Sequence, residues 1–412
     1  MPQITRPSDA DLAALRAKIE GRLPEFLADL ERLVNIDCGS YTPVGVDKVG
    51  RWVGAFLERL GATVESRPDP EGKLGRTIVG SFEGKSGRPR LLLIGHMDTV
   101  FDPGTVAERP YRVDGTIATG PGVTDMKAGL LAGLFALQAI GELPFERLTF
   151  IANPDEEIAS PTSTPHIQEA AADADVALVL ECGRANGNIV SARKGMADME
   201  ITVNGRAAHA GIEPEKGRHA ILEAARIVGD VQALNGRWPG VTFNVGTIHG
   251  GSRPNVVPER CVLEVEARSV TGAGLDTAIA AVREVIARTE VEGTTAEFEI
   301  ETAWRPMEKT ERSGRLAEHA KEVGRRLGIE FDDQLTGGAS DANTTSGMGV
   351  PTLDGLGPVG GNDHAPGEYL ELDSIVPRTA MLAGLLLEIA ADPRVLEWRS
   401  TATARAAQPA GR

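Results

Sequence analysis

Two separate segments of the chain carry residue types that bind metal ions. His96 and Asp98 follow an apolar run at residues 91–94, and Asp125 precedes a long apolar stretch at residues 128–140. The run is typical of a buried strand and the stretch of a buried helix. Because ligands gather at the carboxyl ends of strands in α/β sheets, we expect His96 and Asp125 to share one crevice. An imidazole and a carboxylate are ligands that zinc prefers, although His96 and Asp98 alone fit a surface hydrogen bond about equally well.

Further carboxylates and a histidine occupy later loops. Glu156 and Glu157 are adjacent, Glu181 ends another apolar run, and His364 lies in a glycine-rich loop. Each has an ordinary explanation by itself, because a histidine or a glutamate pair can lie on the surface and Asp125 can cap the helix after it. Metal-ligand types at separate loop positions nevertheless favour one joint site over coincidence.

Composition limits the classes of partner. The chain has 412 residues, which favours two domains. Its net charge of −16, from 43 Lys and Arg against 59 Asp and Glu, argues against nucleic acid or an anionic membrane as a partner. The first residues lack the apolar core of a secretory signal, and we see no run of about 18 apolar residues that would span a bilayer. Cys38, Cys182 and Cys261 have no CxxC spacing and fit a reducing compartment, so we predict a cytoplasmic protein.

Hydrophobic patterning divides the chain into an α/β part and an insert. Strands and helices alternate up to residue 194, beginning with one amphipathic helix expected at residues 9–33. From residue 195 to 304 the order strand, helix, strand, strand, helix, strand predicts a ferredoxin-like unit. Residues 305–412 resume the first pattern, with a tail from about residue 401 that we expect to be disordered.

The chain contains the motifs Gly-His-Met-Asp-Thr-Val, Gly-Pro-Gly-Val-Thr-Asp-Met-Lys-Ala-Gly, Asn-Pro-Asp-Glu-Glu, Gly-Arg-Ala-Ala-His-Ala-Gly and Gly-Gly-Ala-Ser-Asp-Ala. These five motifs resemble those of a known metallopeptidase family. This family includes glutamate carboxypeptidase, aminoacylase, acetylornithine deacetylase and succinyl-diaminopimelate desuccinylase, and the similarity covers about residues 23–387. The resemblance implies an α/β, di-zinc exopeptidase-like catalytic domain with a mixed sheet flanked by helices. It also implies that the insert is an α+β lid and dimerisation domain, and hence a homodimer.

The resemblance implies a complete ligand set for two zinc ions, for which cobalt or manganese could substitute. Asp125 would bridge the two ions, with His96 and Glu181 on one ion and Glu157 and His364 on the other. A bridging carboxylate of this kind holds two cations about 3.5–4 Å apart, so that both can activate one water molecule.

Catalytic roles follow from the same resemblance. Asp98 would fix the tautomer of His96, and Glu156, beside a ligand but not itself one, would be the general base. His209 would donate a hydrogen bond to the oxyanion, from its own subunit or from the partner subunit. The peptide bond after Asp125 is expected to be cis. Cys182 departs from the family pattern, in which proline is common, and a small buried thiol is favoured over a zinc-bound thiolate.

Substrate contacts are also implied by the family motifs. Asn255 and Arg305 would bind the substrate's terminal carboxylate, and Gly337 and Gly338 would let the substrate backbone approach closely. An ordinary explanation remains open for each of these two residues: Asn255 could simply belong to a turn, and Arg305 could form an ion pair at a domain boundary.

The favoured function is zinc-dependent hydrolysis of an amide bond. It would release a C-terminal, glutamate-like amino acid from a short peptide or an N-acyl amino acid with a free carboxylate. An N-acyl amino acid deacylase or desuccinylase is the alternative within the family. A metal-dependent phosphoesterase is the alternative from another class, although we find only scattered arginines to bind a phosphate. A catalytically silent binding protein is disfavoured because Asp98, Glu156 and the ligand residues are all present.

Overall fold

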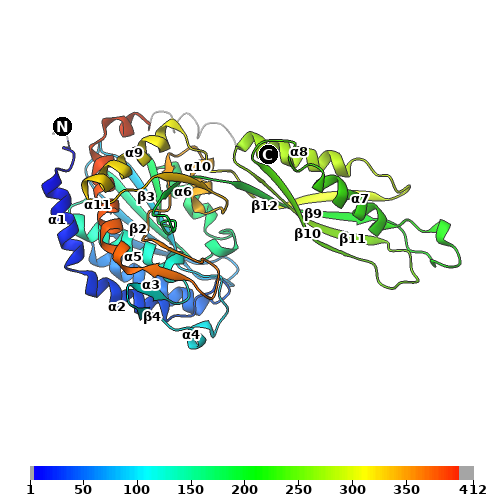
Figure 1. Ribbon diagram of the computed structural model, residues 1–412, viewed down its shortest axis with the longest axis horizontal. Coiled ribbons are helices and arrows are strands. Elements are labelled where there is room, and N and C mark those ends of the chain that lie inside the picture. Colours follow the sequence, from blue (N-terminus) through cyan, green and yellow to red (C-terminus); the bar gives the residue numbers. More distant parts are fainter. Residues whose placement is uncertain (1–3, 399–412) are drawn as a thin grey trace. The chain divides into compact units, whose positions relative to one another are not determined.

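The computed structural model describes residues 4–398 and divides into two compact units (Figure 1). Of the described residues, unit 1 contains residues 4–191, 309–335 and 340–398, and unit 2 contains residues 192–308 and 336–339. The insert was expected between residues 195 and 304, and the short return of the chain to unit 2 at residues 336–339 was not expected. The predicted disordered tail lies outside the described residues.

The main sheet of unit 1 is mixed, which confirms the predicted α/β class. Among the described residues its strand order is β1-β2-β6-β3-β7-β14. The central strand β3 is parallel to both neighbours, and β1 and β2 form the antiparallel side. The strands are β1 (Thr63–Arg67), β2 (Thr77–Glu83), β3 (Arg90–His96), β6 (Arg147–Asn153), β7 (Val176–Val179) and β14 (Thr352–Leu353).

Strand β3 is buried on both faces, as its continuous apolar sequence predicts. Leu91 and Leu93 belong to the main apolar cluster, whereas Leu92 and Ile94 are buried on the opposite face. Helix α5 (Ala128–Ile140) is almost completely buried, because its sequence is apolar on every side.

Helices cover the sheet in groups. Figure 1 shows α1, α5 and α11 close together, and these three pack against one another. Helix α3 packs on β1 and β2, while α10 packs against α6, β7 and β14. The helices of unit 1 are α1 (Asp9–Glu20), α2 (Leu23–Val34), α3 (Pro43–Arg59), α4 (Thr105–Glu108), α5, α6 (Thr164–Ala172), α9 (Glu311–Arg326), α10 (Asp341–Gly347) and α11 (Ile375–Ala391).

The single helix predicted at residues 9–33 is wrong. Helix α1 ends before Gly21, and α2 begins again with Pro24 in its first turn. A proline has no amide hydrogen and therefore suits the first turn of a helix but not its interior. Helix α11 was not predicted, nor was the small sheet with the order β15-β16-β5-β4. Its strands are β4 (Arg112–Asp114), β5 (Ile117–Thr119), β15 (Gly360–Gly361) and β16 (Tyr369–Glu371), and a separate pair joins β8 (Ile189–Arg193) to β13 (Asp333–Thr336).

Two helical stretches are long and apolar enough to cross a membrane by composition alone. They are Val123–Ile140 and Leu372–Ala391, and 83% of each apolar window is buried inside the protein. Core helices of globular proteins meet the same criterion, and burial of this extent identifies both as core helices of unit 1.

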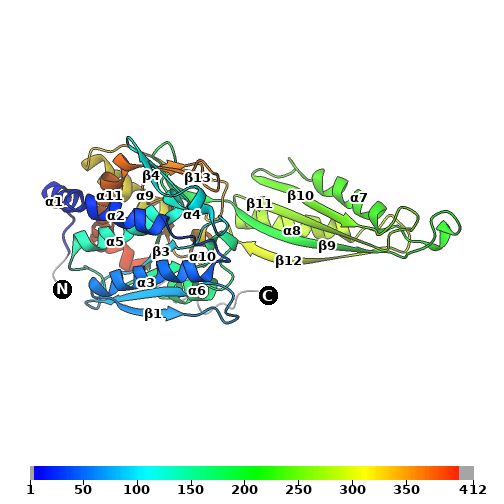
Figure 2. The same ribbon diagram turned by 90° about the horizontal axis from the view of Figure 1, so that it is seen from below.

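Unit 2 has the element order expected for the insert. Its antiparallel strands have the order β10-β11-β9-β12 and run side by side in Figure 2. On β9, Ala197, Met199, Ile201 and Val203 are buried and alternate with partly exposed residues, so helices α7 and α8 cover one face of the sheet. The elements are β9 (Gly195–Asn204), α7 (Ala220–Gln232), β10 (Val241–Gly250), β11 (Arg260–Ser269), α8 (Gly272–Ile286) and β12 (Thr295–Trp304).

A glycine in α5 allows the helix to approach the loop that carries Glu181. A Cβ atom on Gly129 would lie 1.8 Å from the carbonyl oxygen of Leu180, so we expect Gly129→Ala to lower the free energy of unfolding. Overpacking of this kind costs about 1–3 kcal/mol. Urea unfolding followed by circular dichroism measures the change.

Gly314→Ala is the matched control, because it lies in helix α9 of the same unit. Its added Cβ would meet only the side chain of Lys309, at an ordinary 3.6 Å. Alanine favours a helix over glycine by about 0.8–1 kcal/mol, so this variant should be neutral or more stable. Equal destabilisation by both substitutions would contradict the close contact at Gly129.

Candidate metal centre

Three neighbouring strands of unit 1 bring candidate ligands to one edge of the sheet. His96 is the last residue of β3, and the loop after β6 carries Glu156 and Glu157. Glu181 follows β7, which pairs with β3 on the other side. Because these strands are parallel, their carboxyl ends meet, as expected from the sequence.

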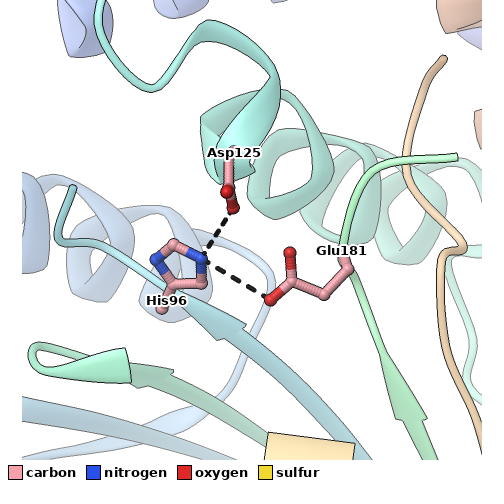
Figure 3. A group of neighbouring side chains, drawn as sticks. All are labelled: His96, Asp125 and Glu181. Carbon is pink, nitrogen blue, oxygen red and sulfur yellow. Dashed lines mark hydrogen bonds and ion pairs between the residues drawn. The ribbon is translucent and has the colours of Figure 1, made fainter. Parts of the chain in front are cut away.

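Asp125 joins His96 and Glu181 in a first group of side chains (Figure 3). The His96 Nε2 atom lies 3.1 Å from Asp125 Oδ1 and 3.5 Å from Glu181 Oε1. Asp125 lies in a distorted turn that leads into α5, and its peptide bond to Met126 is cis, which confirms that prediction.

A second group shares Asp125 with the first. The His364 Nε2 atom lies 3.2 Å from Asp125 Oδ2 and 3.0 Å from Glu157 Oε2. The two oxygens of one carboxylate therefore face two different imidazoles. In each group the potential ligand atoms lie within 4.8 Å of one another, and all of these residues belong to unit 1.

Asp98 is fully buried behind His96 and holds two parts of the centre. Its Oδ1 lies 3.3 Å from His96 Nδ1, and its two oxygens accept hydrogen bonds from the backbone amides of Glu156 and Glu157, both at 3.2 Å. Ser40, which sequence reasoning missed, donates a hydrogen bond of 2.6 Å to Asp98 Oδ2. Asp98 therefore orients the His96 ring and the loop that carries the glutamates.

The electrostatics of the protein without metal reflect an excess of carboxylates. Burial opposes protonation of His96, but the carboxylates of Glu181 and Asp125 outweigh it and raise the pKa of the ring well above its usual value. Asp125 and Glu157 raise the pKa of His364 to about 10. Burial opposes ionisation of Asp125, but the two imidazoles lower its pKa below the usual range. Protonated imidazoles thus balance the carboxylates in place of cations.

Glu156 has the opposite shift. Burial and the neighbouring carboxylates of Glu181 and Glu157 raise the pKa of Glu156 well above its ordinary value. A carboxyl group with a raised pKa is a better proton acceptor near neutral pH than an ordinary glutamate.

The donor set fits divalent cations. Each group offers one imidazole nitrogen and two carboxylates, with Asp125 common to both. Three protein ligands per ion leave a coordination position for water or substrate, as in catalytic zinc sites. His96, Asp125 and Glu181 would hold one cation, and Asp125, Glu157 and His364 the other.

Two buried carboxyl groups near the centre were not predicted. Asp341 accepts hydrogen bonds from the Asn153 side-chain amide and from Ser160 Oγ, and burial raises its pKa to about 7. Glu368 accepts hydrogen bonds from three backbone amides of the turn that carries Asp125, and burial raises its pKa to about 7. Asp341 could have been found from the Gly-Gly-Ala-Ser-Asp-Ala motif, whereas no pattern in the sequence singles out Glu368.

Cys182 is buried beside the centre but belongs to neither candidate ligand group. Its sulfur lies 2.9 Å from Arg184 Nη2 and 3.7 Å from Asp363 Oδ2, and burial raises the pKa of the thiol well above its usual value. A buried thiol with a raised pKa fits the favoured reading of this residue.

His209 and Asn255 lie next to each other in unit 2. The backbone amide of Ala210 donates a hydrogen bond of 3.0 Å to the Asn255 carbonyl, and both His209 and Asn255 are exposed. His209 Nδ1 accepts a hydrogen bond of 3.1 Å from the Gly211 amide, so the neutral ring carries its proton on Nε2.

The other predicted substrate residues already have partners within unit 2. The Arg305 guanidinium pairs with both carboxylate oxygens of Asp276 in α8. The Gly337 carbonyl accepts a hydrogen bond of 2.7 Å from Arg268, and the Gly338 carbonyl accepts one of 2.9 Å from Arg193. The amides of both glycines lie in an exposed segment.

Comparison with known proteins identifies the family. Residues 92–388 match the model of peptidase family M20/M25/M40. The chain belongs to this family. It is 32% identical to carboxypeptidase G2 of Pseudomonas sp. (strain RS-16) over 378 residues, which cover 89% of this chain and 90% of the relative.

The chain is also similar, at lower sequence identity, to two other proteins. Acetylornithine deacetylase of Proteus mirabilis is 27% identical over 274 residues, which cover 61% of this chain and 68% of the relative. The M20 family metallo-carboxypeptidase Sso-CP2 of Sulfolobus solfataricus has a similar structure, with a TM-score of 0.72 at 17% identity over 89% of this chain and 99% of that one. The M20 member described here is therefore a hydrolase of the metallopeptidase type with a candidate site for divalent metal.

The raised pKa values of His96 and His364 predict that metal binding releases protons. Both rings are protonated at pH 7 without metal and must be neutral to bind a cation, so saturation with zinc should release at least about one proton per ring. Metal affinity should accordingly fall as the pH is lowered. Titration calorimetry in buffers of different ionisation enthalpy measures the released protons.

His364→Ala provides the control for this measurement. It should reduce the number of released protons by about one and leave the group of His96, Asp125 and Glu181 intact. Zinc binding without proton release would contradict the proposed pairing of the imidazoles with carboxylates.

Proposed function

We propose that this M20 member is a di-zinc exopeptidase that hydrolyses an amide bond and releases a C-terminal, glutamate-like amino acid. The substrate would be a short peptide or an N-acyl amino acid with a free carboxylate. The observation that supports this most strongly is the pair of Asp125 oxygens, each facing a different imidazole. The similarity to carboxypeptidase G2 across most of both chains favours a carboxypeptidase over other members.

In the proposed mechanism the protein positions groups and moves a proton. Bound divalent cations would polarise the scissile carbonyl and an attacking water. Glu156 accepts the proton of that water and delivers it to the departing amine, and its raised pKa suits both steps. Asp98 keeps His96 in the tautomer whose Nε2 is free to bind.

Unit 2 would supply the contacts to the substrate. We propose His209 as the oxyanion donor, since its Nε2 carries the proton of the neutral ring. Asn255 and Arg305 would bind the terminal carboxylate, and Gly337 and Gly338 would accept the close approach of the substrate backbone. A homodimer through unit 2, a lid role for this unit, a cytoplasmic location and zinc rather than cobalt or manganese remain parts of the proposal.

Glu156→Gln tests the proton transfer. The amide cannot accept a proton, so we expect kcat to fall by about 10²–10⁴-fold while two metal ions per chain are retained. Kinetics combined with elemental analysis of the purified variant measure both quantities.

Glu157→Gln provides the matched comparison, because it changes the adjacent residue in the same way. Glu157 lies in the second ligand group, so this variant should lose metal as well as activity. A Glu156→Gln enzyme within tenfold of the wild type would exclude Glu156 as the general base.

A substrate panel separates the alternatives. Folate and acyl-glutamates test the carboxypeptidase, and N-acetyl and N-succinyl amino acids test the deacylase or desuccinylase, which the similarity to acetylornithine deacetylase supports. A phosphate monoester tests the phosphoesterase. Turnover of acetyl or succinyl compounds alone, lost on chelation, would replace the carboxypeptidase assignment with the deacylase.

Arg305→Lys tests recognition of the terminal carboxylate. Arginine binds a carboxylate through two parallel hydrogen bonds that lysine cannot reproduce, so we expect kcat/KM to fall by about a hundredfold. Substrates amidated at that carboxylate should be poor for the wild type and hardly worse for the variant.

Asp276→Asn controls for the ion pair observed in the structure. It weakens the partner of Arg305 but keeps the guanidinium, so substrate binding through Arg305 should survive. If Asp276→Asn reproduces the loss caused by Arg305→Lys, the arginine acts through the ion pair and the exopeptidase proposal loses this recognition element.

A further inference from the structure

We infer that Glu368 is a positioning residue of the metal centre, whose carboxylate fixes the turn that presents Asp125. The inference rests on the proposed role of Asp125 as the shared ligand. It concerns a residue outside both candidate ligand groups, four positions after His364.

Glu368 makes three hydrogen bonds to one short turn. Its Oε2 accepts from the amide of Gly122 at 2.8 Å, and its Oε1 accepts from the amides of Thr124 at 2.8 Å and Asp125 at 3.0 Å. The residue is only 1% exposed, so water does not compete for these amides. A buried carboxylate that accepts three hydrogen bonds holds its donors more firmly than a neutral acceptor would.

The conformation of the turn explains why it needs an external anion. Gly122 has a φ of 73°, in the left-handed region, and its own amide points to the same carboxylate as the amides of Thr124 and Asp125. Backbone amides that converge in this way form a concave site for an anion. Within the described turn no side chain caps these amides, and a buried amide without a partner costs about 1–3 kcal/mol.

The segment that provides Glu368 also provides His364. The pairing of β16 with β5, in which Tyr369 lies opposite Thr119, brings this segment beside the turn. His364 contacts the Oδ2 atom of Asp125, and Glu368 contacts the backbone amide of Asp125. One stretch of chain therefore holds Asp125 at both its side chain and its backbone, which directs the two oxygens toward different imidazoles.

Replacement by glutamine isolates this role. Glu368→Gln keeps the size of the side chain but turns one acceptor into an NH₂ group, which cannot accept from an amide. At least one of the three hydrogen bonds is then lost, and the turn can rotate. Outer-shell partners of metal ligands typically contribute 10–100-fold to metal affinity, and we expect a loss in this range.

The experiment is a titration of the metal-free protein with Co²⁺, followed by visible absorption, and with Zn²⁺, followed by calorimetry. Glu368→Gln should bind both ions about 10–100-fold more weakly and change the cobalt spectrum, because the orientation of Asp125 changes. Glu371→Gln is the matched control: it makes the same substitution in the same segment, at a partly exposed carboxyl away from the turn, and should bind like the wild type.

Thermal unfolding of the metal-free variants separates positioning from general stability. Glu368→Asp keeps the charge but shortens the side chain, so we expect its metal affinity to lie between those of the wild type and Glu368→Gln. It is the variant to measure if Glu368→Gln does not fold. Two-metal binding by Glu368→Gln with wild-type affinity and spectrum would overturn the inference. The inference would also be overturned if the metal affinity of both Glu368 variants fell only in proportion to the fraction of each variant that is folded. Wild-type protein that binds no metal would instead overturn the proposed function.

Discussion

The candidate centre depends on how the negative charge of one carboxylate, that of Asp125, is compensated. Its two oxygens lie 3.1 Å from His96 and 3.2 Å from His364, and both imidazoles have further carboxylate neighbours. Such a concentration of negative charge is unfavourable in a buried place unless protons or cations compensate it. The same requirement that raises the pKa values of the histidines without metal is what would attract two divalent ions.

The fold meets this requirement with rigid elements. Parallel pairing of β3 with β6 and β7 fixes three of the contributing loops at one edge of the sheet. Helix α5 packs its Gly129 directly against the Leu180 carbonyl, so the turn before the helix and the loop after β7 lie in close contact. Asp98 then ties the His96 ring to the loop of Glu156 through backbone amides. Precise placement of ligands thus comes from the sheet and from buried hydrogen bonds rather than from the loops themselves.

Local patterns were sufficient for the part of the site that lies at strand ends. His96 and Glu181 follow apolar runs and could be located from the sequence, and the element order of unit 2 could be read from alternating polarity. The family motifs, rather than patterning, supplied the shared role of Asp125. Glu368 could not be assigned, because its partners are backbone amides more than a hundred residues away. Asp341 lies in a family motif, but its buried contact with Ser160 depends on the fold and could not be read from the sequence. The ion pair of Arg305 with Asp276 likewise depends on the packing of α8 and is invisible to sequence spacing.

The return of residues 336–339 to unit 2 has a consequence for how this protein can change. Within residues 4–398 the chain passes between the units four times, because this short segment leaves unit 1 and comes back to it. Inside unit 2 its carbonyls are bound by the Lys194 amide and by the side chains of Arg193 and Arg268. Unit 2 is therefore not a cassette that can be exchanged as one continuous stretch. A replacement insert would have to bring its own donors for a segment that is separated from it in the sequence by residues 309–335 of unit 1, so the two pieces are constrained to change together.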